Sequence, residues 1–153
     1  MIPLRIRPHV VALAAVALGG LAPGAALGAQ SGGEQAFDIH SGQTLTFAAK
    51  VEGGKVIVGR PRVSRLGAAH PAAGEMTVDL TPRDKDMYEQ VIVNEKTSQP
   101  IDFVATALVG DVKIDERVLC GRLDGPASSR IGANHWRVRL HDFEVGKGDG
   151  SCD

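Results

Sequence analysis

Residues 101–120 read IDFVATALVGDVKIDERVLC, and this stretch decides the fold class because it contains two alternating runs around Gly110-Asp111. This dipeptide suits a two-residue hairpin turn of type I′ or II′. Counting outward from the turn predicts three apolar pairs on one face: Val109 with Val112, Ala107 with Ile114, and Phe103 with Val118. The opposite face is polar and carries Asp102, Thr106, Lys113, Asp115 and Arg117. The stretch therefore predicts a hairpin that covers a core on one side only.

A second hairpin is predicted in residues 43–59, QTLTFAAKVEGGKVIVG, with Gly53-Gly54 as its two-residue turn. The pairs expected outward from this turn are Glu52 with Lys55, Val51 with Val56, Ala49 with Val58 and Phe47 with Arg60. Pro61 then interrupts the alternation, so a strand that follows it is expected at a sheet edge, at a bulge or as a new beginning.

Alternation predicts further strands at 37–40, 76–80, 88–93 and 136–145. In the last of these, the residues expected to face inward are Trp136, Val138 and Leu140. The alternation changes phase near His141-Asp142, which predicts a β-bulge there.

The mature chain lacks an apolar stripe of helical period, and its eight or so short strands recur about every ten residues. This pattern predicts an all-β fold, an antiparallel β-sandwich of immunoglobulin-like size over residues 37–153. A small closed β-barrel is the alternative, because periodicity does not count sheets. The loops at 67–74 and 121–134 are interpreted as connections between the two sheets.

The N-terminal residues 1–29 have the layout of a cleaved secretory signal peptide: two arginines, an apolar run, then small residues before Gln30. Residues 30–36 are expected to form a flexible leader. No later apolar run is long enough for a membrane span. We therefore expect a periplasmic or secreted protein with no membrane span in its mature chain.

The two cysteines, Cys120 and Cys152, are expected to form one disulfide, because an exported chain with two cysteines meets an oxidising compartment. Closing this loop constrains the unfolded chain by about 3 to 4 kcal/mol on the chain-entropy view. The chain has no CxxC motif, which favours a structural bridge over a redox-active one.

Charge argues against nucleic acid as the partner. Removing Arg5 and Arg7 from the 17 basic residues leaves 15 against 18 acidic ones, a net charge near −3. A polyanion is not attracted by a negative chain. One Trp, one Tyr and four Phe also offer little for base stacking.

The most suggestive cluster is basic and consists of Arg60, Arg62, Arg65, Arg137 and Arg139. Guanidinium groups bind carboxylates and phosphates in a planar, two-pronged geometry. The cluster predicts a face for an acidic protein or an anionic glycan or lipid of the cell envelope. The alternative is that Arg137 and Arg139 lie on the solvated side of a strand and pair with carboxylates across the sheet.

A metal carrier for copper or zinc is the second functional hypothesis, with His40, His70, His135 and Met76 as possible ligands. These residues do not show the spacing of a known metal motif, and no cofactor is predicted. A hydrolase is the third hypothesis, through Ser129, His141 and an Asp, although the chain contains no GxSxG elbow. The first hypothesis is a non-enzymatic binding module that presents residues 60–74 and 121–135 to an unknown partner.

Overall fold

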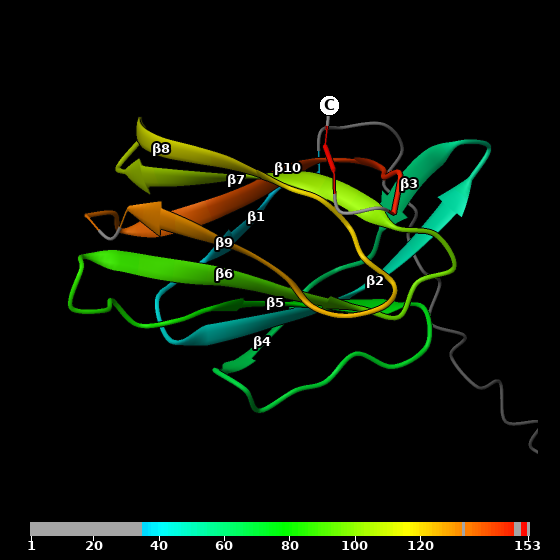
Figure 1. Cartoon of the computed structure of the whole chain (residues 1–153), viewed down its shortest axis with the longest axis horizontal. Coiled ribbons are helices and arrows are strands. Elements are labelled where there is room, and N and C mark those ends of the chain that lie inside the picture. Colours follow the sequence, from blue (N-terminus) through cyan, green and yellow to red (C-terminus); the bar gives the residue numbers. More distant parts are fainter. Residues whose placement is uncertain (1–34, 133, 149–150, 153) are drawn as a thin grey trace, which may run out of the picture. The chain divides into compact units, whose positions relative to one another are not determined.

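The computed structural model describes residues 35–132, 134–148 and 151–152, and these residues form strands and loops (Figure 1). The predicted signal peptide and most of the predicted leader lie outside the described residues. The strands in the described part are β1 (Phe37–Ile39), β2 (Gln43–Glu52), β3 (Lys55–Val58), β4 (Arg62–Arg65), β5 (Glu75–Leu80), β6 (Tyr88–Glu95), β7 (Ile101–Val109), β8 (Val112–Leu119), β9 (Ala127–Gly132) and β10 (Arg137–Val145). Within the described ranges, no helix is long and apolar enough to cross a membrane.

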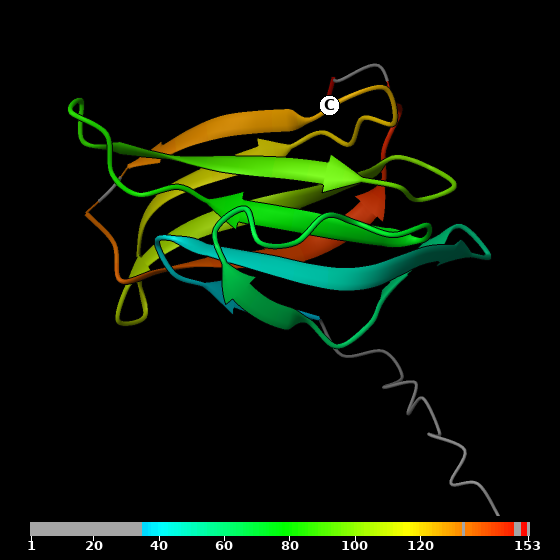
Figure 2. The same cartoon turned by 90° about the horizontal axis from the view of Figure 1, so that it is seen from below.

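The strands form two packed antiparallel sheets, as predicted for a β-sandwich. One sheet has the order β1-β10-β7-β8, and the other has the order β3-β2-β5-β6-β9, with β4 also paired to β2. The edge strands β8 and β9 approach each other (Figure 2). They are joined by side chains: Arg117 Nε donates to the Arg130 carbonyl at 3.0 Å, and Gly132 N–H donates to Asp115 Oδ2 at 2.9 Å. Because these contacts replace a backbone ladder, the two sheets stay separate and the barrel does not close.

Alternating residues of both sheets fill the core, because side chains on a strand point to opposite faces with period two. The buried core residues include Leu45 and Phe47 on β2, Met76, Val78 and Leu80 on β5, Val91 and Val93 on β6, and Val138 and Leu140 on β10. All four phenylalanines, Phe37, Phe47, Phe103 and Phe143, pack together with ring centroids 5.1 to 5.7 Å apart. This cluster connects strands of one sheet to strands of the other.

The hairpin of β2 and β3 has the predicted register, with Glu52, Val51 and Ala49 opposite Lys55, Val56 and Val58. The ladder ends at that last pair, so Phe47 and Arg60 are not ladder partners as expected. After Pro61 the chain forms β4, which pairs with the first half of β2. The expectation of an edge strand after Pro61 is confirmed, because β3 and β4 share one side of β2.

The hairpin of β7 and β8 forms, but most of its predicted register is wrong. Val109 lies opposite Val112 as expected, and then a bulge leaves Ile114 without a partner. Beyond it, Ala107 lies opposite Asp115 and Phe103 lies opposite Leu119. One extra residue exchanges the two faces of a strand. Val118, beyond the bulge, is therefore 55% exposed instead of facing the core, and the unpartnered Ile114 is 44% exposed. Val112 keeps its predicted partner beside the turn but is also exposed, by 66%.

The prediction for β10 is correct in its centre and wrong at its start. Val138 and Leu140 are buried, and the predicted bulge lies between His141 and Glu144, where Asp142 has a φ of 52°. Trp136 precedes the strand, and it is 69% exposed instead of facing the core.

Two loop predictions also need correction. The segment 67–74 joins β4 to β5 within one sheet, and crosses the outer face of that sheet (Figure 2). The region 121–134, predicted to be irregular, contains β9, while its first part does cross from one sheet to the other.

The predicted disulfide between Cys120 and Cys152 is confirmed, with the two Cα atoms 5.4 Å apart. It attaches the segment after β10 to the residue that follows β8. The neighbouring Gly121 N–H donates to Asp102 Oδ1 at 2.7 Å, so this corner packs closely against the start of β7.

Replacing Gly121 with alanine should destabilise the fold, because its Cβ would lie 2.3 Å from the backbone nitrogen of Ile101. We expect the free energy of unfolding in urea to fall by about 1 to 3 kcal/mol, the usual effect of overpacking. Gly125→Ala is the matched control, because a Cβ there meets nothing within 4 Å. Equal stability of the two variants would contradict this account.

Candidate functional site

Three of the five candidate arginines lie on one edge of the six-stranded sheet. Arg62 and Arg65 are the ends of β4, and Arg60 lies in the link between β3 and β4. All three residues are exposed. We call Arg60, Arg62 and Arg65 the basic edge. It forms because Pro61 ends one ladder with β2 and the chain begins another after it.

The charge of the basic edge is only partly compensated. Arg62 Nη2 lies 2.7 Å from Glu75 Oε1, and this hydrogen bond holds the pKa of Glu75 below its ordinary value. Among the described residues, neither the Arg60 nor the Arg65 guanidinium has an ion pair or a hydrogen bond. Two guanidinium groups of this edge are therefore available to an anion.

Arg137 and Arg139 lie on β10 in the other sheet, so the structure does not bring all five arginines to one edge. Arg139 binds both carboxylate oxygens of Asp38, at 2.8 and 3.1 Å. Arg137 lies 3.2 Å from Asp38 and 3.1 Å from Asp111. The hydrogen bond from Arg139 holds the pKa of Asp38 below its ordinary value. Both arginines therefore pair with carboxylates, and Asp38 lies directly opposite Arg139 on the neighbouring strand. This is the arrangement expected if Arg137 and Arg139 lie on the solvated side of an ordinary strand.

The four-stranded sheet also carries a chain of hydrogen bonds across three strands. Thr106 donates to Glu116 Oε2 at 3.0 Å and lies 2.8 Å from His141 Nε2, while His141 Nδ1 lies 2.9 Å from Asp142. The Thr106 hydroxyl and the Lys113 ammonium lower the pKa of Glu116.

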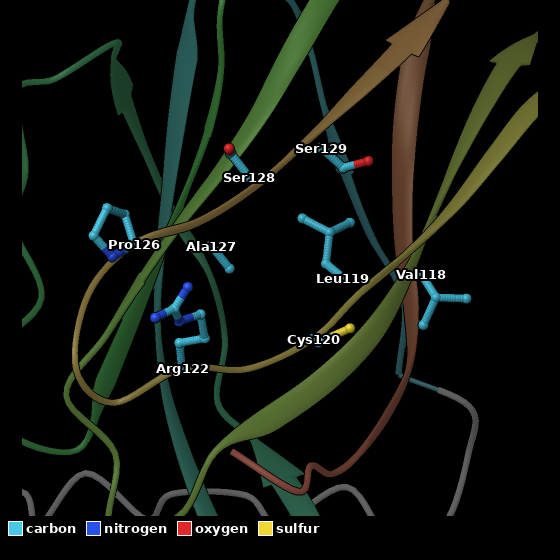
Figure 3. Close-up of a pocket in the computed structure, with 8 residues that line it drawn as sticks. All are labelled: Val118, Leu119, Cys120, Arg122, Pro126, Ala127, Ser128 and Ser129. Atoms are coloured by element: carbon cyan, nitrogen blue, oxygen red, sulfur yellow. The ribbon is translucent and has the colours of Figure 1, made fainter. Parts of the chain in front are cut away.

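The structure does not bring Ser129 and His141 together as a hydrolase would need. Ser129 lies on β9 in the six-stranded sheet, and His141 is bonded to Thr106 in the other sheet. Ser129 instead lines a pocket of about 300 Å³ between the end of β8 and the start of β9 (Figure 3). The lining consists of Val118, Leu119, Cys120, Arg122, Pro126, Ala127, Ser128 and Ser129. It includes no histidine or carboxylate, and Arg122 is paired with Asp124 at 3.1 Å.

The sequence did not predict a buried pair of ionisable groups, His135 and Glu89. Their side chains are 2% and 6% exposed, and His135 Nε2 lies 3.3 Å from Glu89 Oε2. Burial lowers the pKa of His135, although the charge of Glu89 opposes this effect. A signal existed, since the alternation of β6 places Glu89 on the same face as Val91 and Val93.

The possible metal ligands are held in different environments. Met76 is a fully buried part of the core, and His70 lies exposed in the loop between β4 and β5. His40 Nδ1 lies 2.8 Å from the carbonyl oxygen of Trp136. In the part of the chain that the structure describes, no group of three or more His, Cys, Asp or Glu residues is placed to hold a metal ion.

Comparison with protein-family models, curated proteins and solved structures found no match to this chain. Functional inference therefore depends on the geometry of its own residues.

The buried His135 should make stability depend on pH. The native state holds this proton less tightly than the unfolded chain, whose histidine has an ordinary pKa of 6.5. Acidification through that range should therefore lower the free energy of unfolding, and the loss should continue down to the native pKa.

Urea unfolding followed between about pH 7.5 and 5.5 measures this slope. We expect His135→Gln to flatten it, whereas His70→Gln, a change in an exposed loop, should leave it unchanged. An identical slope in the His135→Gln variant would show that another group is responsible.

Proposed function

We propose that this chain is a non-enzymatic, exported binding module whose basic edge recognises an acidic protein segment. The observation that carries the proposal is that Arg60 and Arg65 are exposed on one short edge and lack a compensating carboxylate in the described residues. Guanidinium groups in this state have donors free for the carboxylates of a partner.

Hydrogen bonds hold the backbone just before and just after the basic edge, which favours recognition. Gly67 N–H, just beyond β4, donates to Thr44 Oγ1 at 3.0 Å, and that hydroxyl is bonded in turn to Asp79. On the opposite side, Gly59 N–H donates to the Ala48 carbonyl at 2.8 Å. Binding residues held by a rigid scaffold lose less conformational entropy when the partner arrives.

Arg137 and Arg139 are assigned a structural role in this proposal. Both contact Asp38 of β1, so they attach this three-residue strand to β10. An anion that bound them would have to displace a carboxylate that is already hydrogen-bonded. The basic edge has no such competition at two of its three arginines.

Export is part of the proposal and rests on the expected signal peptide at 1–29. The partner would then be a protein of the cell envelope or the exterior. A net negative mature chain agrees with a local basic patch that selects acidic protein segments over nucleic acid.

The double variant Arg60→Ala with Arg65→Ala should bind a fluorescent, Glu-rich peptide about tenfold more weakly at low salt, as expected for two charge-assisted contacts. Fluorescence anisotropy measures this loss. Binding by the unmodified protein should also weaken as salt is added, because exposed charges are screened.

Lys85→Ala with Lys96→Ala is the control for the same change in net charge, since both residues are exposed and lie outside β4: Lys85 in the connection between β5 and β6, and Lys96 directly after β6. It should reduce binding by no more than about twofold. Equal losses in the two double variants would contradict recognition at the basic edge.

A further inference from the structure

The backbone register shows which groups of β4 face outward. Leu66 N–H donates to the Gly42 carbonyl, and Gly59 N–H donates to the Ala48 carbonyl. The backbone groups of the even-numbered residues of β2 therefore point toward β3 and β4. Ser64 and Arg62 lie opposite Thr44 and Thr46, so their backbone N–H and C=O groups pair with β2. Alternation in an antiparallel ladder then directs the backbone groups of Val63 and Arg65 to the open side.

The outward side of the neighbouring strand β3 is partly occupied, whereas that of β4 is open. The outward Val58 N–H of β3 is taken by Gln35 Oε1 at 3.1 Å. In the described structure, β4 pairs only with β2. The Arg65 carbonyl accepts Ala68 N–H at 3.0 Å, which leaves the Arg65 N–H and both backbone groups of Val63 without a ladder partner.

The side chains of β4 add a pattern to this edge. Val63 lies opposite Leu45, and residues opposite each other share a face. Leu45 is 1% exposed, whereas Val63 is 58% exposed, so the core-facing side of β4 is not covered. Arg65 shares the face of Val63, and Arg62 lies on the opposite face.

We propose that the basic edge binds its acidic partner by strand addition: an extended segment pairs antiparallel with β4. This inference rests on the proposed function and specifies its ligand. Read from its N-terminus, the segment would lie opposite Arg65, Ser64, Val63 and Arg62 in turn. It would therefore carry an acidic, a polar, an apolar and an acidic residue. The first carboxylate would meet Arg65 and the apolar residue would cover Val63, while the last carboxylate would bind the neighbouring Arg60, since Arg62 is already paired with Glu75.

Two isomeric peptides test the register. The first contains Glu-Thr-Val-Glu between neutral polar flanks, and the second contains Glu-Val-Thr-Glu in the same flanks. Exchanging the central residues moves the valine to the wrong face of the added strand. Fluorescence anisotropy with the full chain at low salt should show about tenfold tighter binding of the first peptide.

Backbone methylation tests the ladder directly. N-methylation of the peptide valine removes the N–H that would donate to the Val63 carbonyl, and should weaken binding about tenfold. N-methylation of the threonine changes an N–H that points away from β4, and should weaken binding by less than about twofold. On the protein side, Val63→Pro removes only an outward N–H and should also weaken binding, whereas Val63→Thr keeps that group.

The outcomes separate this inference from the proposed function. If both isomers and both methylated peptides bind equally, and binding still depends on Arg60 and Arg65, strand addition is overturned and charge recognition stands. A sulfated glycan or an anionic vesicle that binds as tightly as the first peptide also overturns strand addition. If binding is unchanged in the Arg60→Ala, Arg65→Ala variant, both proposals fail.

Discussion

The packing of all four phenylalanines between the sheets is the interaction on which the structure depends. Phe37 and Phe143 come from the four-stranded sheet and Phe47 from the other, with centroids no more than 5.7 Å apart. Aromatic pairs in tilted or edge contact contribute about 0.5 to 1.5 kcal/mol each beyond the area they bury. The cluster fixes how the sheets face each other, while the backbone ladders within each sheet decide which strands lie at its edges.

The edge strands β3, β4, β8 and β9 differ in what contacts their outward sides. β8 and β9 are linked by Arg117 and Asp115 through side-chain contacts to the opposite backbone. β3 is capped by the side chain of Gln35. β4 is short and charged, the features by which proteins usually keep an edge from aggregating. In the described fold, however, the Arg65 N–H and both backbone groups of Val63 have no ladder partner. In the proposed function, this charged edge would exclude most strands and admit one of opposite charge.

Ion pairing divides the arginines in a way that their spacing in the sequence does not. In the sequence, Arg137 and Arg139 resemble the arginines of the basic edge, but the strand order places Asp38 beside them. Arg60 and Arg65 meet no carboxylate in the described fold. A similar distinction separates His135, which folding buries against Glu89, from the exposed His70. Candidate residues acquire their chemistry from neighbours that are distant in sequence.

The sequence by itself determined most of the strands, the turn at Gly53-Gly54, the bulge after His141 and the pairing of Cys120 with Cys152. Each of these follows from local alternation, turn chemistry or the presence of only two cysteines. Only the tertiary structure decided the bulge at Ile114, the formation of β9, the exposure of Trp136 and the open edge of β4. Bulges, burial and free backbone groups depend on which strand lies alongside, and that neighbour is set when distant segments pack together. A period of two fixes which residues share a face, but it does not fix the partner that each face meets.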